Sequence, residues 1–367
     1  NFLNSDRLSV QIGGQIHSYR PENYFSKQEI SLYDKFTQFA LIAAKQAVSS
    51  SGIEFTDESR AGVGVILGTA GGGLQTQDEN YRQVYEVGKN RVHPLTVPKL
   101  MNNAAASHVS MKYKAQGPCF TIASACSSSN HAMGQALNLI RTGCAKTILT
   151  GGSESMLCFG GIKAWEGLRI MSKEACRPFC ATRDGMVQGE GAAIFIFEEY
   201  EQAMNRGANI FAEVAGFSMS SDASDIVNPN MDGAARAIAG ALIDAKLNIN
   251  EIGYINAHGT GTIANDKTEC DAIKKVFKEQ AKDLMISSTE SMHGHLIGGT
   301  GALELLSCIL AINEGIIPPT INFKQNDKDC DLDIVPNFAR DKKIYNTLSN
   351  SFAFGGLNAV LALKKLV

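Results

Sequence analysis

Residues 117–129 read GPCFTIASACSSS, a short apolar segment that leads into a cysteine and then into small polar residues. The apolar part, residues 120–123, has the length and composition of a buried strand. The small residues after Cys126 open a segment, from about Ser127 to Arg141, with the pattern of a helix rich in small side chains. A strand, a cysteine and a helix in this order are typical of an α/β protein.

The same alternation of strand and helix patterns continues along the chain. Apolar residues recur at helical spacing in 36–47, 237–245, 273–277 and 302–312, and short apolar runs typical of strands lie at 63–67, 147–150, 194–197, 211–214, 252–255, 285–288, 345–351 and 358–363. This pattern predicts an α/β fold with helices packed against mixed sheets. The 367 residues suffice for two domains or two similar halves, and we place the division at residue 205, giving units 1–205 and 206–367.

Composition excludes several classes of protein. With 44% hydrophobic residues the chain can bury a core, and a net charge of -3 argues against a nucleic-acid binder. Nine irregularly spaced cysteines do not form the disulfide framework of a small secreted domain. Asn1 to Val10 lack a basic start and an apolar block, and no window offers about 20 continuous apolar residues. We therefore expect a cytoplasmic protein without a signal peptide or membrane span.

Cys126 is the cysteine best placed for chemistry. A thiol at a helix N-terminus meets the positive end of the helix dipole and several unpaired N–H groups, and both favour the thiolate. The same N–H groups can hold a developing oxyanion. A single cysteine is more often a core residue, but its position between a strand and a helix distinguishes Cys126 from the other eight.

Two histidines follow predicted strands in the second half of the chain. His258 lies in NAHGTGT (256–262), and His295 lies in SSTESMHGH (287–295). Loops at strand ends often carry the chemistry of α/β proteins, although a single histidine is more often structural. His293 and His295 can also be read as a His-x-His metal pair. No further ligand stands at convincing spacing, so no metal is expected.

Together these segments resemble the elongating β-ketoacyl-ACP synthases of type II fatty acid or polyketide synthesis, which belong to the thiolase superfamily. The likeness runs through nearly the whole chain in family order. Each motif alone is modest evidence, but their joint order is specific. The matching segments are ACS (125–127), RPF (177–179), RDG (183–185), GEG (189–191), NAHGT (256–260), GH (294–295) and NSFAFGGLN (350–358), the last of which by itself could be a simple hairpin.

The resemblance implies a thiolase-like fold of two similar halves stacked as α-β-α-β-α layers, and usually a dimer. It implies that Cys126 accepts an acyl group from the phosphopantetheine thioester of acyl carrier protein. His258 and His295 would then assist decarboxylation of malonyl-ACP and stabilise the resulting enolate, which attacks the acyl-cysteine. The N–H groups of Cys126 and Phe354 would form the oxyanion hole, with Phe354 also gating the acyl pocket.

The remaining roles that the resemblance implies concern substrate binding. Thr260 and Thr262 would contact the pantetheine arm, and Met101 and Phe352 would line the acyl pocket. No metal or redox cofactor is needed, because the substrates are carried on the phosphopantetheine of acyl carrier protein.

The chain departs from the family pattern at several positions. Glu290 stands where the family has a lysine, and that lysine normally pairs with a glutamate that matches Glu304. Two carboxylates should repel each other, so one is expected to turn to solvent or to hold a proton with a raised pKa. Leu357 and Ala353 replace a common threonine and glycine, residues 31–32 lack the usual basic character near the carrier-protein dock, and the chain begins after the family's usual first strand.

Three functions remain open from the sequence. The first is an active 3-oxoacyl-ACP synthase, working as a homodimer or with a related subunit. The second is a chain-length-factor-like partner subunit of a heterodimeric ketosynthase, with little activity alone. The third is a cysteine hydrolase or degradative thiolase, which does not explain two histidines beside residues 350–358. Because such partner subunits commonly lose the cysteine, the retained Cys126 favours the first.

Overall fold

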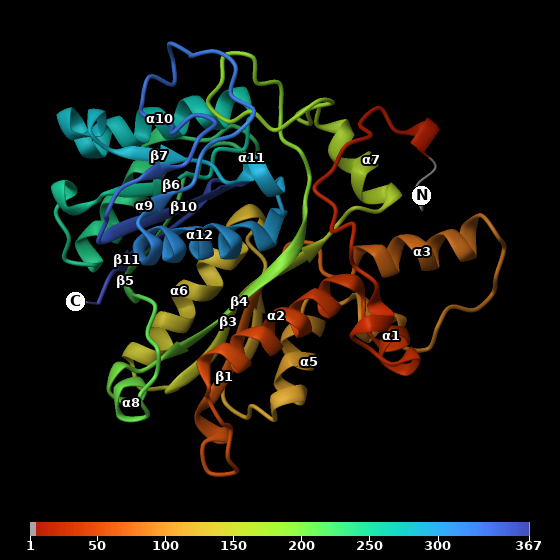
Figure 1. Ribbon diagram of the computed structural model, residues 1–367. Helices are drawn as coiled ribbons and strands as arrows, with labels where there is room; N and C mark the ends of the chain where they lie inside the picture. Colours follow the sequence, from red (N-terminus) through yellow and green to blue (C-terminus); the bar gives the residue numbers. More distant parts are fainter. Residues whose placement is uncertain (1–4, 367) are drawn as a thin grey trace.

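Two β-sheets form the framework of the computed structural model, which describes residues 5–366 (Figure 1). The first sheet has the order β2-β1-β3-β4 and the second the order β5-β11-β10-β6-β7, while β8 and β9 pair separately. The strands are β1 (Val63–Gly68), β2 (Cys119–Ile122), β3 (Thr147–Ser155), β4 (Glu190–Glu198), β5 (Glu213–Ser221), β6 (Tyr254–Asn256), β7 (Met285–Ser287), β8 (Ile316–Ile317), β9 (Arg340–Asp341), β10 (Asn346–Ala353) and β11 (Leu357–Lys364).

Helices alternate with these strands, as the sequence predicts. The α-helices are α1 (Lys27–Leu32), α2 (Lys35–Ser51), α3 (Leu74–Tyr85), α4 (Thr96–Leu100), α5 (Ala104–Tyr113), α6 (Ser128–Arg141), α7 (Phe159–Gly167), α8 (Tyr200–Asn205), α9 (Met231–Asp244), α10 (Ile263–Phe277), α11 (Glu290–His293) and α12 (Thr300–Glu314). Two short 3₁₀ turns matter for the site, η4 (Ala125–Ser127) before α6 and η7 (Ile297–Gly299) before α12.

The two sheets repeat one connectivity. In the first, β1 pairs in parallel with β2 and β3, and β3 pairs antiparallel with β4. In the second, β6 pairs in parallel with β7 and β10, and β10 pairs antiparallel with β11. In each half a helix follows the corresponding strand, α6 after β2 and α12 after β7. The predicted fold of two similar halves is thereby confirmed.

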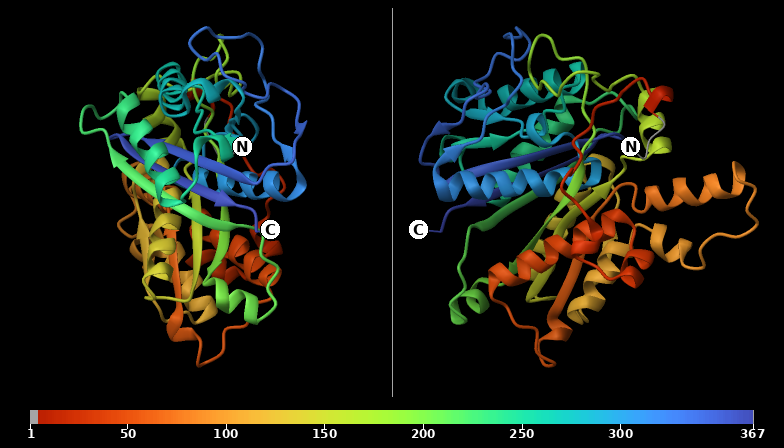
Figure 2. Two further views of the ribbon diagram at one scale, coloured as in Figure 1. Left: turned by 90° about the vertical axis from the view of Figure 1, so that its left-hand side faces the viewer. Right: turned by 45° about the vertical axis from the view of Figure 1, so that its right-hand side comes forward.

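Helices α6 and α12 form the central layer between the two sheets (Figures 1 and 2). Their apolar faces share one core with both sheets, including Met133 and Ala136 of α6 and Leu305 and Ile312 of α12. Helices α2 and α5 cover the outer face of the first sheet, and α9 and α10 cover that of the second. This is the α-β-α-β-α layering that the resemblance implied.

The start of α6 is held very close to the ends of β1 and β3. A Cβ at Gly68 would lie 2.4 Å from the backbone of Ser128, and a Cβ at Gly152 would lie 1.9 Å from the Ser129 Oγ. Because only glycine permits such an approach, these two residues fix the position of the helix start and of Cys126 just before it.

The predicted elements and the structure differ mainly at surface helices. The sequence pattern missed α3, because its side chains are mostly polar and Thr76 is its one buried residue. The strand expected at 211–214 begins at Glu213 and continues through alternating polar residues to Ser221. The division at residue 205 stays a prediction. The segment expected to lack a signal peptide begins with Asn1 to Asn4, which lie outside the described residues.

One helical stretch, Ile297–Glu314, is long and apolar enough to cross a membrane by length and composition. Its mean hydropathy is 1.2, and 61% of it is buried inside the protein. A core helix between two sheets is also long and apolar, because both of its faces contact apolar side chains.

Candidate active site

Cys126 lies in the turn η4, between the end of β2 and the start of α6. The residue before it, Ala125, has a φ of 50°, a left-handed conformation that is strained for a residue with a Cβ. The turn is held by the Ser128 hydroxyl, which donates to the Ala125 carbonyl at 2.6 Å, and by the Ser351 hydroxyl, which donates to the Cys126 carbonyl at 3.1 Å. The predicted sequence of strand, cysteine and helix is therefore confirmed.

His258 follows β6 in a tight loop. The backbone N–H groups of His258 and Gly259 donate to the carboxylate of Glu269 at 3.0 and 2.8 Å. Gly259 has a φ of 38°, and a Cβ there would lie 2.5 Å from the Ser288 Cβ. The glycine and the buried carboxylate together fix the backbone that carries the imidazole.

His295 follows α11 and joins the first half of the chain. Its backbone N–H donates to the Val187 carbonyl at 2.6 Å, and the Gly189 N–H donates to its carbonyl at 2.8 Å. His293 lies nearby, but its ring nitrogens contact the Gly294 carbonyl and the Thr289 hydroxyl. Both ring nitrogens of His293 thus contact groups other than His295. These contacts do not form the His-x-His metal pair that the sequence allowed.

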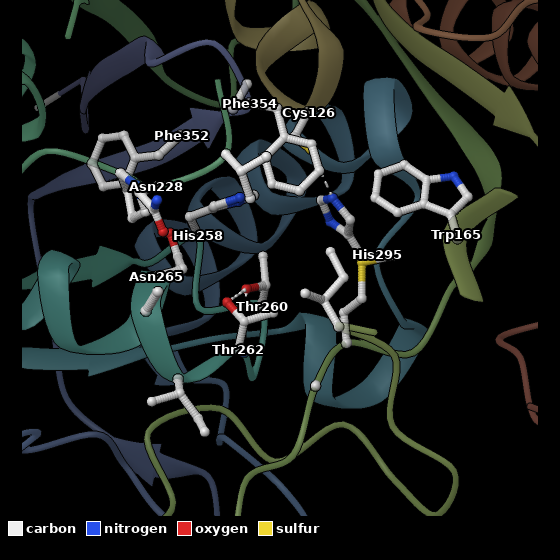
Figure 3. A pocket seen from close by; sticks show the side chains of 18 of the residues that line it. Cys126, Trp165, Asn228, His258, Thr260, Thr262, Asn265, His295, Phe352 and Phe354 are labelled. Atoms are coloured by element: carbon white, nitrogen blue, oxygen red, sulfur yellow. Dashed lines mark hydrogen bonds between the residues drawn. The ribbon is translucent and has the colours of Figure 1, made fainter. Parts of the chain in front are cut away.

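The structure brings Cys126, His258 and His295 together at one end of a pocket (Figure 3). The Cys126 Sγ lies 3.0 Å from the His295 Nε2, and the two imidazole rings have centroids 5.3 Å apart. All three side chains are buried. A thiol in contact with an imidazole, with a second imidazole beside it, is the arrangement that nucleophilic catalysis through sulfur needs.

The second nitrogen of the His295 ring, Nδ1, contacts Glu290. The His295 Nδ1 lies 2.6 Å from the Glu290 Oε1, so the Nδ1 carries a proton and donates it to the carboxylate. This contact leaves the Nε2 to accept the thiol proton from Cys126, a tautomer assigned from the hydrogen-bond network. Burial lowers the pKa of His258 well below 6.5, with a further contribution from His295, so His258 is a neutral imidazole at neutral pH.

Glu290 and Glu304 are both fully buried, so neither turns to solvent. Burial raises the pKa of each carboxyl well above 4.5. The neighbouring carboxylates of Asp266 and Glu269 raise the pKa of Glu290 further. Those of Glu290 and Glu269 do the same for Glu304. Of the two outcomes expected from the sequence, the burial of both carboxyl groups favours the raised pKa.

The pocket has a volume of about 290 Å³ and is lined by residues from both halves of the chain. Thr260 and Thr262 line it, and their hydroxyl oxygens lie 2.9 Å apart. Phe352 and Phe354 also line it, and the Phe352 ring contacts His258 edge-on at 6.2 Å between centroids. Met101 is 47% exposed and does not belong to this lining.

Sequence reasoning missed other lining residues. Trp165, from α7, stacks on Phe354 with ring centroids 5.9 Å apart and an interplanar angle of 21°. Asn228 and Asn265 face the same space (Figure 3). Trp165 is the chain's single tryptophan, which is the one signal that could have drawn attention to it. The asparagines carry no such signal.

Comparison with known families assigns the chain. Residues 7–203 match the family described as "Beta-ketoacyl synthase, N-terminal domain", and residues 211–324 match "Beta-ketoacyl synthase, C-terminal domain". The chain belongs to the β-ketoacyl synthase family, as the motif order predicted.

Similar proteins of known name cover nearly the whole chain. "Nodulation protein E" of Rhizobium sp. (strain N33) is 43% identical over 98% of this chain and 89% of its own length. "3-oxoacyl-[acyl-carrier-protein] synthase 2" of Staphylococcus aureus (strain N315) is 38% identical over 99% of this chain and 89% of its own length. These relatives support assignment of the chain as a β-ketoacyl-ACP synthase.

Solved structures agree with the fold. "The ishigamide ketosynthase/chain length factor" superposes with a TM-score of 0.95 at 32% identity, covering 100% of this chain and 91% of that one. A ketosynthase described as in complex with its type II PKS acyl-carrier protein and bound to the hexaketide superposes with a TM-score of 0.89 at 32% identity, covering 99% and 90%.

Proposed function

We propose that this protein is an elongating 3-oxoacyl-ACP synthase, which condenses malonyl-ACP with an acyl group held on Cys126. The observation that carries the proposal is the 3.0 Å contact between the Cys126 Sγ and the His295 Nε2, with the neutral His258 beside it at the end of one pocket. The first reaction is thioester exchange. The His295 Nε2 takes the thiol proton, the sulfur attacks the acyl carbonyl, and the pantetheine thiolate leaves and recovers the proton.

The second reaction forms the new carbon–carbon bond. Malonyl-ACP loses carbon dioxide, and the electron pair of the broken bond forms an enolate on the thioester. Neutral His258, as an N–H donor, stabilises the enolate oxygen in a buried site where such hydrogen bonds are strong. The enolate carbon attacks the acyl carbonyl on Cys126, and the cysteine thiolate leaves as 3-oxoacyl-ACP forms.

Backbone and pocket groups complete the proposed machinery. The N–H groups of Cys126 and Phe354 form the oxyanion hole, and Thr260 and Thr262 contact the pantetheine arm. The substrates bring their own thioester, so no redox cofactor enters these steps. A cytoplasmic location stays a prediction.

The proposed partners are acyl carrier protein and a second ketosynthase-like subunit, either another copy or a related chain. Structural neighbours described as bound to an acyl carrier protein and as paired with a chain length factor support this. So does β2, an edge strand of the first sheet, whose Phe120 is 39% exposed. Exposed apolar side chains on a sheet edge favour pairing with another chain.

The test is reconstitution with purified protein, malonyl-ACP and an acyl-ACP primer. We expect 3-oxoacyl-ACP as product and, without malonyl-ACP, an acyl group on Cys126 detected by mass spectrometry. The trapped acyl group also reports the primer and chain length. If the chain accepts no acyl group and makes no product alone, yet raises the activity of a related synthase, the chain-length-factor-like role replaces this proposal.

A further inference from the structure

A second group of titratable side chains, Glu290 and Glu304, lies beside His258. The His258 Nδ1 is 3.7 Å from the Glu290 Oε1, and a nitrogen or oxygen atom from each of His258, Glu290 and Glu304 lies within 4.8 Å of the others. The three side chains come from the loop after β6, from α11 and from α12. Glu290 and Glu304 are fully buried and His258 is 2% exposed.

This group is rich in polar atoms that have nothing to bond. Within residues 5–366, the His258 Nδ1, the Glu290 Oε2 and both carboxylate oxygens of Glu304 have no hydrogen-bond partner. Buried polar atoms are almost always paired, because an unpaired one costs on the order of 1–3 kcal/mol, and more when it is charged. Three buried side chains that hold four such atoms, and that each bring a ligand atom within 4.8 Å of the others, therefore call for a ligand that attracts them.

Other buried carboxylates in this protein show what a purely structural one looks like. Glu154 accepts from the Thr69 hydroxyl and from the N–H groups of Ala70 and Gly298. Glu269 accepts two backbone N–H groups and the Asn350 amide. The fold thus supplies donors where a carboxylate only holds chain segments together, and the part of the chain that the structure describes supplies none to Glu304.

We propose that His258, Glu290 and Glu304 bind one divalent transition-metal cation, Zn²⁺ or Mn²⁺. One imidazole nitrogen and two carboxylates form a donor set that suits such ions, and the two negative charges balance the cation's charge. Ligands about 2.0–2.2 Å from a metal lie roughly 3–4.4 Å from one another, so the observed spacing needs only small side-chain movements. The proposal departs from the metal-free site expected from the sequence, where no ligand set was visible because these residues are far apart in the chain.

A cation at this position would also act on the chemistry of His258. Ligation through the Nδ1 leaves the proton on the Nε2, the nitrogen available to the substrate. His258 would then be fixed as a hydrogen-bond donor, while the Glu290 Oε1 still accepts from His295. This consequence rests on the proposed condensation, whereas the cation site itself does not.

The test begins with metal content. Protein expressed with added Zn²⁺ and Mn²⁺ and purified without chelator should hold about one of these ions per chain, as measured by inductively coupled plasma mass spectrometry. Protein refolded with a chelator should regain a higher Tm when Zn²⁺ or Mn²⁺ is added, since a ligand that binds only the folded state raises stability. A wild type with no bound ion and no saturable binding at micromolar metal overturns the proposal.

Variants locate the ion. Glu304→Gln should lower affinity by at least about 100-fold, in excess of the 10–100-fold typical of groups one step removed from a metal. Glu290→Lys supplies a positive charge beside Glu304, so it should fold, hold no metal and show a Tm insensitive to chelator. Glu154→Gln, which alters a buried carboxylate outside the cluster, should keep the ion.

Cys126→Ala separates this site from an alternative. Cys126, His258 and His295 also have ligand atoms within 4.8 Å of one another, and a thiolate is a strong metal ligand. If the cation binds at the two glutamates, Cys126→Ala keeps it at full content. Loss of the ion in Cys126→Ala, with retention in Glu304→Gln, would place it at the thiol and contradict the proposal. None of these measurements depends on condensation activity, so failure of the proposed function would leave them interpretable.

Discussion

The two halves of the molecule place different chemistry at the same position of one repeated design. In the first half, β2 leads through η4 into α6 and carries the sulfur of Cys126. In the second half, β7 leads through α11 and η7 into α12 and carries Glu290, His295 and Glu304. Because α6 and α12 share the central layer, the two strand-to-helix turns meet, and the Cys126 thiol from one half contacts the His295 imidazole from the other. Function here comes from what each copy places at the turn, rather than from the fold itself.

Their buried carboxylates differ in the same way. Glu154, at the end of β3, is surrounded by donors, one of which is the Gly298 N–H of η7, so it ties the two halves together. Glu290 gives one oxygen to His295, and Glu304 has no hydrogen-bond partner among the described residues. A buried charge with a full set of donors belongs to the architecture, and one without them points to chemistry or a ligand.

The largest effect is expected when the sulfur that the first half contributes is removed. Cys126→Ala should lower acyl transfer and elongation by at least about 10⁴-fold, because the variant lacks the sulfur on which the acyl chain is proposed to be held. The measurement is the yield of acyl-enzyme by mass spectrometry and of 3-oxoacyl-ACP. Cys144→Ala, at an exposed cysteine that does not line the pocket, is the matched control and should behave as wild type. Acylation of Cys126→Ala at another residue would contradict the assignment.

The next largest effect separates the tasks of the two histidines, both of which come from the second half. His258→Ala should lower condensation by about 10³-fold, since the enolate loses a neutral donor, yet leave acyl transfer within about tenfold of wild type. Single-turnover assays of acylation and of elongation with preformed acyl-enzyme distinguish the steps. His17→Ala, far along the chain at an exposed position, serves as the control. Equal losses in both steps would show that the histidines do not divide the work as proposed.

Glu154 provides a prediction about pH and stability. Burial raises the pKa of Glu154 from 4.5 to about 7, despite the four groups that donate to it. Between these two values the folded state binds a proton more tightly than the unfolded state, so the free energy of unfolding falls as pH rises through that window, by about 3 kcal/mol from this group.

Urea denaturation at pH 5 and pH 8 tests this. Glu154→Gln should remove much of that pH dependence, whatever it does to stability overall, while Glu58→Gln at an exposed site should leave the dependence unchanged. An unaltered pH dependence in Glu154→Gln would mean that the carboxylate stays ionised in the folded protein at pH 5.

The strands of the two main sheets, the central helices and the candidate residues Cys126, His258 and His295 were predictable from the sequence, and the reason is local. Buried strands read as apolar runs, and Cys126 and His258 follow them directly. Helix α3 was not predictable, because it buries almost nothing and so has no apolar stripe. The partner of His295 was not predictable as such either. Glu290 was noticed as a departure, but only three dimensions show that it contacts the ring nitrogen opposite the thiol.

The smallest effect is expected at Trp165, a residue of the first half in a pocket that both halves line. Its stacking on Phe354 is worth about 0.5–1.5 kcal/mol, so Trp165→Leu should raise KM for the acyl donor by roughly 2–10-fold and change kcat little. The split between KM and kcat matters, because a ring that only fills space would alter the Tm but not KM. Phe338→Leu, at an exposed aromatic residue, is the matched control. If Trp165→Leu instead lowers kcat and leaves KM unchanged, the stacked ring acts on Phe354 during the reaction, and the first half contributes more to the chemistry than its sulfur.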